Sequence, residues 1–283
     1  MVKEHYHFDL YDKHIFERVV LKPPLKAPGI MPNEACFIYA AEGESHVYSA
    51  TEEMHLHTEE AVVMKCGNYF NEWLKTKNSD SCEAIAVHFY PEVLKKIYDK
   101  ELPAFFKEVE KVKPVCIEKV KASRLLKNYI DSLMYYFNNP ELVSDELLKL
   151  KLKELILLLA RTDNAESIQR LIASLFTPTE YSFKELIEAN VYNNLTLEEL
   201  ALLHNTSLSS FKREFKKVYN TSPAKYFKQR KLQRAAKLIS HTNERIGEIA
   251  FNCGFTEVAH FSRSFQEQFG CSPTQYRLTH TNN

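Results

Sequence analysis

The first ninety positions of the chain are dominated by short runs in which apolar and polar residues alternate. Because successive side chains of a β-strand point to opposite faces, this period of two predicts strands with one buried face. Gly43 and Gly67 lie where turns would join neighbouring strands. The pattern therefore predicts a β-rich N-terminal region, with its clearest strands at Ala35 to Ala40, Ser45 to Ser49, Ala61 to Lys65 and Glu83 to Tyr90.

Further along the chain the apolar residues recur with the helical period. Pro91, which a helix accepts at its first position, is expected to open a helix through Lys100. Two longer amphipathic helices are predicted from Ser123 to Phe137 and from Asp145 to Arg161. Polar residues bracket one more short helix between residues 160 and 180, and we place a domain boundary in this segment, after residue 165.

The helix predicted from Asp145 to Arg161 has more leucines than one narrow stripe can hold. Such a helix needs apolar neighbours on more than one side. Packing inside its own domain would provide them, and so would the same helix of a second protomer. For the second alternative, a homodimer, we name Leu148, Leu152 and Ile156 as contact residues.

A chain of 283 residues is long enough for two domains. Its 45% hydrophobic and 26% charged residues exclude a mainly disordered or fibrous protein. The six cysteines never stand at a two-residue spacing and no signal peptide is recognised, which favours a reducing cytoplasm. Six charged residues interrupt the most apolar stretch, Leu142 to Ala160, so we expect no membrane span.

The formal net charge is zero, but charge is distributed unevenly along the chain. From Glu180 onward there are 14 basic and ten acidic residues, whereas the rest of the chain has 23 basic and 27 acidic ones. Between Phe211 and Lys237 ten basic residues accompany the single acid Glu214. A solvated helix face is one interpretation of this local excess, and a surface for nucleic acid is the other.

A segment near the C-terminus occurs twice. FKREFKKVYNTSPAKYF begins at Phe211, and FSRSFQEQFGCSPTQYR begins at Phe261. At this offset of 50 residues, Arg213 matches Arg263 and Tyr226 matches Tyr276. The repeat indicates one structural unit used twice.

Each copy has the spacing of a helix, a tight turn and a second helix. In the first copy Thr196 and Glu199 have capping-box spacing, and Ser207 is placed to cap the helix after the turn. Asn205 and Gly254 stand in the two turns, where the left-handed conformation is needed. Further caps are predicted at Thr256, Ser222–Pro223 and Ser272–Pro273.

The second helix of each copy has a polar stripe opposite its phenylalanines. An α-helix fits the major groove, where Arg or Lys can contact guanine, Gln can contact adenine, and a small apolar side chain can contact a thymine methyl. The stripes consist of Ser209, Lys212, Arg213 and Lys216 in the first copy, and of Ala259, Ser262, Arg263 and Gln266 in the second.

The segment from Glu180 to Arg277 resembles the DNA-binding domain of the AraC/XylS family of transcription regulators, most closely in IGEIAFNCGFTEVAHFSRSFQEQFGCSPTQYR from Ile246. The resemblance implies two helix-turn-helix units joined by a long helix, here Pro223 to about Ser240, that contact successive major grooves of double-stranded DNA. It adds Val258 to the base-contacting residues. We expect phosphate contacts from the joining helix, through Lys225, Arg230 and Arg234.

Two positions depart from the family pattern. Asn205 replaces the glycine usual in the first turn, and Val258 and Ala259 stand where polar residues often contact bases. The second departure weakens the expectation of base discrimination by the second unit.

The first half of the chain resembles, more loosely, the cupin-like sensor and dimerisation domains of this family. We therefore expect an α+β protein, with residues 1–165 forming a cupin-like β-barrel or sandwich plus a helical dimerisation segment, and residues 166–283 forming an all-α double helix-turn-helix domain. The effector would be a small molecule or a partner protein. Buried aromatic residues either line an effector pocket or form simple core, and the candidates for a pocket are Tyr39, Tyr48, Tyr69 and Trp73.

A metal site is a further possibility to weigh in this half. His55 and His57 form an HxH pair, and Glu60 with Gly67 has the E-x6-G spacing of metal cupins. The number of residues between His57 and Glu60 is too small for that motif, and His88 is the only other candidate ligand on a predicted strand. We therefore expect no metal.

Enzymatic chemistry is not indicated. No cysteine lies in the Pro-Cys-His-Arg context of DNA-repair relatives, and no Gly-rich phosphate loop occurs. We expect a transcription regulator that is not an enzyme and carries no cofactor, and we favour an activator over a repressor. Two alternatives remain: a cupin-type metalloenzyme tethered to a DNA-binding domain, and an adaptor that binds a partner protein.

Overall fold

The structure of the protein is a computed structural model that describes residues 1–75, 80–98, 115–120, 123–161, 181–193 and 195–280. The chain divides into two compact units, Met1–Glu180 and Tyr181–Asn283. The boundary predicted after residue 165, and the short helix predicted beside it, lie outside the described residues.

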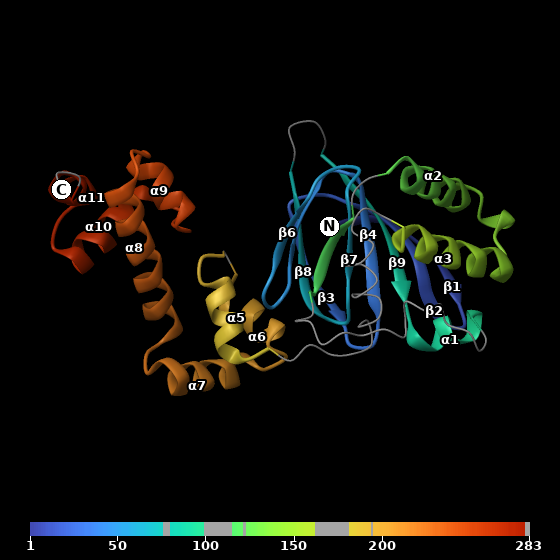
Figure 1. The fold of residues 1–283 in the computed structure, drawn as a ribbon, viewed down its shortest axis with the longest axis horizontal. Helices are drawn as coiled ribbons and strands as arrows, with labels where there is room; N and C mark the ends of the chain where they lie inside the picture. The colour runs from blue at the N-terminus through green and yellow to red at the C-terminus, as the bar shows by residue number, and fades with distance from the viewer. Residues whose placement is uncertain (76–79, 99–114, 121–122, 162–180, 194, 281–283) are drawn as a thin grey trace. The chain divides into compact units, whose positions relative to one another are not determined.

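The first unit contains two antiparallel β-sheets (Figure 1). One sheet has the strand order β1-β2-β9-β4-β7-β10, from Val2–Leu10, Lys13–Leu21, Cys82–Phe89, Ala35–Glu42, Ala61–Met64 and Ile117–Val120. The other has the order β3-β8-β5-β6, from Leu25–Met31, Gly67–Leu74, Glu44–Tyr48 and Glu53–Leu56. Because the two sheets are not joined into one closed sheet, the cupin-like region is a sandwich and not a closed barrel.

The four strands given ranges in the sequence analysis correspond to β4, β5, β7 and β9, and the other six, β1, β2, β3, β6, β8 and β10, were not individually predicted. Strand β4 is buried at six consecutive residues, Ala35 to Ala40. Its register pairs Phe37 with Val63 on one side and with Val87 on the other. A central strand buried on both faces loses the simple alternation of an exposed sheet.

Helices α1 (Pro91–Ile97), α2 (Arg124–Asn138) and α3 (Asp145–Leu159) pack on the six-stranded sheet, with the short 3-10 helix η2 (Pro140–Leu142) between α2 and α3 (Figure 1). Ser123 caps α2 by accepting a hydrogen bond from the Leu126 amide, and Ser144 caps α3 in the same way. The shared core joins Phe37 and Tyr39 of the sheet to residues of all three helices.

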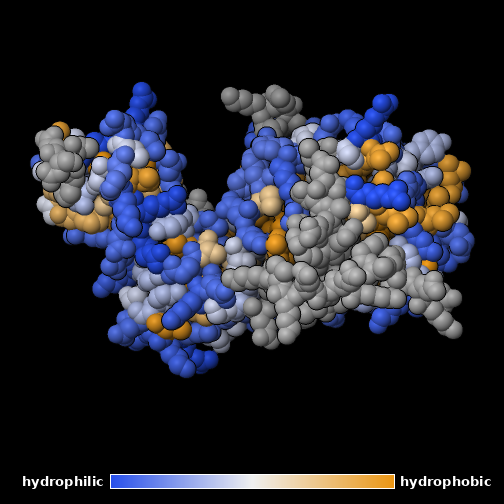
Figure 2. Space-filling view, in the orientation of Figure 1, coloured by the Kyte–Doolittle hydropathy of each residue, from blue (hydrophilic) through white to orange (hydrophobic). Residues whose placement is uncertain are grey.

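The three residues of α3 that we expected to contact a second protomer are buried in the first unit. Leu148, Leu152 and Ile156 are at most 5% exposed and belong to this core. Their burial on the sheet of their own protomer corrects the expectation that they contact a partner. The apolar side chains that α3 does expose are Leu150 and Leu157, and Figure 2 shows apolar surface over α2 and α3.

The second unit is entirely helical in its described residues. Its helices are α5 (Phe183–Asn190), α6 (Leu197–Leu203), α7 (Leu208–Tyr219), α8 (Pro223–His241), α9 (Ile246–Asn252), α10 (Val258–Phe269) and α11 (Pro273–His280). Helices α6 and α7 form the first helix-turn-helix, α9 and α10 form the second, and α8 joins them (Figure 1).

Each copy of the repeat has its own aromatic core. In the first, Phe211 and Phe215 are fully buried, and their rings lie 5.1 and 6.0 Å from that of Phe183. In the second, Phe261 and Phe265 are fully buried against residues of α8 and α9. Phe251 of α9 lies outside this core and is 56% exposed.

The described helices include none that is both long enough and apolar enough to cross a membrane.

Candidate nucleic-acid interface

The polar stripe of the first recognition helix, α7, faces solvent. Ser209, Lys212, Arg213 and Lys216 are all exposed, whereas Phe211 and Phe215 are buried on the other side. The helix begins after Ser207, whose side chain accepts a hydrogen bond from the Ser210 amide. With its apolar face held in the core, α7 presents three cations in one exposed row.

Helix α10 has the same arrangement with different chemistry. Val258, Ala259, Arg263 and Gln266 are exposed and Ser262 is half-buried. Phe261, Ser264 and Phe265 are buried on the opposite side. The predicted cap Thr256 is corrected: the residue before the helix is Glu257, and no side-chain capping hydrogen bond is made.

The turns of the two copies have matching hydrogen bonds. Asn205 donates its amide to the Leu202 carbonyl at 2.9 Å, and Gly254 donates to Phe251 at 2.8 Å. The next residues bond to Ala201 and Ala250, at 2.9 and 3.0 Å. Asn205 has φ 55° and Gly254 has φ 77°, so Asn205 adopts the left-handed conformation that glycine adopts in the other copy. The first departure from the family pattern therefore leaves the turn intact.

The three cations expected to contact phosphate have different environments on α8. Lys225 is exposed. The guanidinium of Arg234 stacks on the ring of Tyr192 at 4.4 Å. Arg230 binds Glu188 of α5 through both terminal nitrogens, at 3.0 and 2.9 Å, and Tyr226 at 2.7 Å. Arg230 therefore ties α5 to α8, and its expected phosphate contact stays a prediction.

The contacts of Arg230 and Tyr226 also affect the protonation of the Glu188 carboxyl group. The hydrogen bond from the Arg230 guanidinium has the largest effect and lowers the pKa of Glu188; burial opposes it, and the hydrogen bond from Tyr226 lowers the pKa further. The glutamate thus stays ionised and accepts both bonds. Sequence spacing could not reveal the pair, because 42 residues separate Arg230 from Glu188.

Two further basic residues, which the sequence pattern did not reveal, hold the second copy in place. Lys231 of α8 donates to the carbonyl of Gly254 in the turn, at 3.1 Å. Burial lowers the pKa of this amine. Arg277 of α11 donates to the carbonyls of Ile239 and Glu244, at 3.4 and 2.7 Å. Basic residues in this unit therefore serve its own structure as well as its exposed face.

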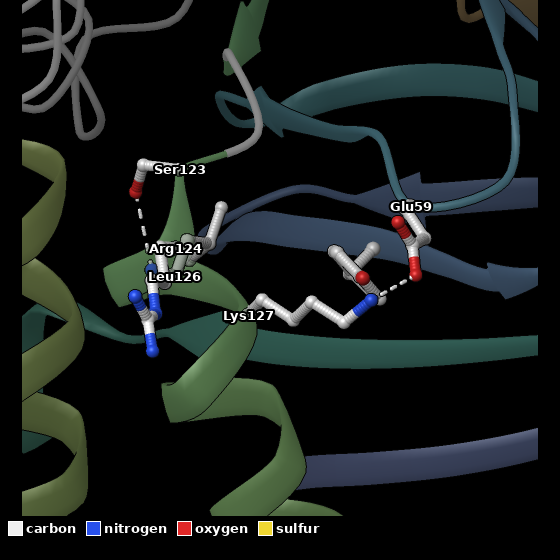
Figure 3. A pocket seen from close by; sticks show the side chains of 6 residues that line it. Glu59, Ser123, Arg124, Leu126 and Lys127 are labelled. Atoms are coloured by element: carbon white, nitrogen blue, oxygen red, sulfur yellow. Dashed lines mark hydrogen bonds and ion pairs between the residues drawn. The ribbon is translucent and has the colours of Figure 1, made fainter.

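In the first unit, a cavity of about 240 Å³ lies at the start of α2 and is lined by Tyr39, Glu59, Ser123, Arg124, Leu126 and Lys127. Figure 3 shows Lys127 paired with Glu59 across it. Of the four aromatic residues expected to line one pocket, Tyr39 lines this cavity. The other three are buried elsewhere: Tyr48 donates to Glu72 at 3.2 Å, Tyr69 donates to the Lys65 carbonyl at 2.8 Å, and Trp73 pairs with Leu25 in the sheet.

The side chains of the HxH pair, His55 and His57, do not converge with Glu60 and His88, the other ligands considered for a metal. Glu60 accepts a hydrogen bond from the His57 amide at 2.8 Å and binds Lys119 at 2.6 Å. His88 lies between Glu17 and Glu34, at 3.8 and 3.5 Å. The side chains of His55 and His57 instead meet Glu44.

Comparison with known proteins covers both units. Residues 35–171 match the family model described as ExsA N-terminal regulatory domain, and residues 200–279 match one described as Helix-turn-helix domain. The helix-turn-helix match and the relatives below support assignment to the AraC/XylS family of transcriptional regulators.

Members of this family differ in how much of the chain they match. The virulence regulon transcriptional activator VirF of Yersinia enterocolitica is 30% identical over 133 residues, 47% of this chain and 49% of that one. The transcriptional activator RhaR of Mannheimia succiniciproducens is 27% identical over 258 residues, 83% and 90% of the two chains. Thus the chain spans about half the length of the first curated relatives it matches. A solved structure of fatty-acid-bound ToxT from Vibrio cholerae aligns over 95% of this chain and 96% of its own, with 11% identity and a TM-score of 0.40.

Proposed function

We propose that this AraC/XylS protein binds double-stranded DNA in a sequence-specific manner and activates transcription. The observation that carries the proposal is the pair of recognition helices, α7 and α10, each with a buried phenylalanine face and an exposed row of residues able to contact bases. The printed descriptions of VirF and RhaR as activators support activation.

The two rows suit different base edges. Arg213 and Arg263 can form paired hydrogen bonds to guanine, and Gln266 can do so to adenine. Val258 and Ala259 can contact the methyl group of thymine. In the first row Ser209, Lys212 and Lys216 add polar and charged contacts. The proposed operator therefore has two sub-sites of different composition.

The length of α8 suits two grooves on one side of DNA. Its 19 residues give a helix about 28 Å long at 1.5 Å per residue. Successive major grooves on one face of DNA lie about 34 Å apart. We propose that α7 and α10 enter neighbouring major grooves and that two cations of α8, the exposed Lys225 and Arg234 nine residues further along, contact the DNA backbone.

For the first unit we propose regulation through dimerisation and an effector, either a small molecule or a partner protein. The ExsA N-terminal regulatory domain match supports a regulatory role. The cavity beside Tyr39 and Arg124 is the proposed place for a small-molecule effector. The exposed residues Leu150 and Leu157 replace the buried leucines as the proposed dimer contact.

Selection of DNA from a random duplex pool by the full-length protein tests the DNA-binding proposal. We expect a two-part consensus sequence. Arg213→Ala and Arg263→Ala should each weaken binding to the selected site by about 1 to 3 kcal/mol and relax preference at single base pairs. Lys217→Ala, which removes an exposed cation of α7 outside the row, is the matched control and should relax no position. Failure to enrich any sequence would contradict the proposal.

Sedimentation tests the proposed dimer contact. A Leu150→Lys/Leu157→Lys variant should sediment as a monomer where the unmodified protein sediments as a dimer. Ile30→Lys, which charges a side chain 59% exposed on β3, should leave the mass unchanged. A folded double variant with the unmodified mass would overturn the contact.

A further inference from the structure

The HxH pair has no part in DNA binding, yet its two histidines are brought together with a carboxylate of the neighbouring strand. Strands β5 and β6 pair antiparallel with His46 opposite His55. Because strand side chains alternate between faces, Glu44 and His46 of β5 share a face with His55. Ser45 and Val47, on the opposite face, are buried. The strand pairing therefore places the Glu44 carboxylate and several imidazoles on one side of the hairpin.

The separations fit coordination of one ion. Oε2 of Glu44 lies 3.3 Å from Nε2 of His55, and Oε1 lies 3.5 Å from Nδ1 of His57. One ligand atom from each of the three residues can be chosen so that all lie within 4.8 Å of one another. Bonds of about 2.0 to 2.1 Å at a tetrahedral zinc ion place ligand atoms roughly 3.4 Å apart. Two ligand atoms at the 4.8 Å limit would have to approach by about 1.4 Å, which the half-exposed His57 can provide by rotating.

His55 has one ion-pair contact, with Glu44, and that contact does not satisfy its ring nitrogen as a hydrogen bond. Its Nε2 atom is buried and, among the described residues, makes no hydrogen bond. Its ring lies between those of His46 and His57, with centroids 4.4 and 4.0 Å away and ring planes tilted by 53° and 47°. His46 is in turn held by Glu53, 3.0 Å from its Nδ1. A buried polar atom without a hydrogen bond is costly, and a bound ion would remove that cost.

We propose that Glu44, His55 and His57 bind one divalent transition-metal ion of the zinc type, with water completing the coordination. Nitrogen and carboxylate ligands in this number are those of an open zinc site. Strand β6 is the edge of its sheet, so the ion would bridge that edge strand to β5. Glu60 takes no part, because the His57 amide and Lys119 already bind it.

A second cluster offers a matched control. His7, Asp9 and His14 are again two histidines and one carboxylate, and their ligand atoms also lie within 4.8 Å of one another. All three are exposed, however, and His14 Nδ1 already lies 2.5 Å from Asp9 Oδ1. An ion there would have to displace an existing hydrogen bond without the gain of satisfying a buried nitrogen.

The test is titration of untagged, chelator-treated full-length protein with Zn²⁺ alone, against a chromophoric competitor. We expect Glu44→Gln and His55→Gln each to weaken a single tight site at least about tenfold, as loss of a ligand should. His7→Gln and His14→Gln should leave that site unchanged. In parallel, Co²⁺ should give visible absorption bands of a four-coordinate site that Glu44→Gln abolishes.

Circular dichroism checks that each variant is folded, and Glu44→Gln, nearly identical in shape, provides the decisive comparison if His55→Gln unfolds. The proposal is overturned if the unmodified protein binds Zn²⁺ no more tightly than Glu44→Gln does. It is equally overturned if the tight site is lost in His7→Gln and kept in Glu44→Gln.

Discussion

The two helix-turn-helix copies share a scaffold and differ in the chemistry they expose. Both turns contain a residue in the left-handed conformation and make equivalent hydrogen bonds. Both second helices bury two phenylalanines. The first helix exposes Lys212, Arg213 and Lys216, whereas the second exposes Val258 and Ala259 with one arginine. A duplicated fold thus keeps its buried positions while its surface changes, and for the proposed DNA contact this predicts a charge-dominated contact by α7 and a more apolar one by α10.

The largest expected effect tests the shared scaffold. Phe215→Ala and Phe265→Ala each remove a fully buried ring, and we expect each to lower the free energy of unfolding by about 3 to 5 kcal/mol. Chemical denaturation of the full chain measures it. Phe251→Ala, at a ring that is 56% exposed, should change the free energy little. If only one of the two buried variants were destabilised, the copies would not be equivalent.

The charge difference predicts unequal salt dependence. Removing Lys212 and Lys216 together should reduce the slope of log K against log salt by up to about 2, since each phosphate contact contributes about 0.9. Gln266→Ala in α10 should weaken binding to the selected site and leave the slope unchanged. Titrations at several salt concentrations distinguish these outcomes. A lowered slope for Gln266→Ala would remove the distinction between the helices.

The turns predict a smaller effect on stability. Gly254→Ala places a Cβ at φ 77°, and we expect a loss of about 1 to 2 kcal/mol. Gly254→Asn should cost less, because Asn205 adopts this conformation in the first copy. Asn205→Gly should be nearly neutral. Thermal unfolding checks the order, and an equal loss for the alanine and asparagine variants would contradict it.

The smallest effect concerns the tie made by Glu188 in the first copy. Its pKa is lowered in the folded protein, so this stabilisation is present above the unfolded value near 4.5 and is lost as pH falls through the folded pKa. Because Glu188 is about half-exposed, we expect less than about 1 kcal/mol. Glu188→Gln should flatten the pH dependence of unfolding below pH 4.5. An unchanged profile would show that the pair contributes nothing measurable.

Much of the C-terminal unit was predictable because its determinants are local. The capping box of Thr196 and Glu199 and the cap Ser207 are present in the structure. The expected end of α8 near Ser240 lies within one residue of its last residue, His241. Helix periodicity, caps and turn residues act within about one helical turn of each other, so sequence spacing records them directly.

The N-terminal unit was less predictable because its contacts are long-range. The spacing of Leu148 and Leu152 shows that they share a helix face, but not whether a sheet of the same chain or a second protomer covers it. The first three strands were not predicted, and β4 is buried on both faces, where alternation carries little information. Which surfaces meet is decided by the pairing of distant strands.

The sequence by itself determined the repeated unit, its turns and the identity of the residues on each recognition helix, since these follow from intervals of three and four residues. Only the tertiary structure decided that Arg230 binds Glu188, that Phe251 faces solvent, and that His55 and His57 meet Glu44 and not Glu60. Helical spacing specifies which side chains share a face. The partner of that face is chosen by packing and strand register, which join residues far apart in the chain.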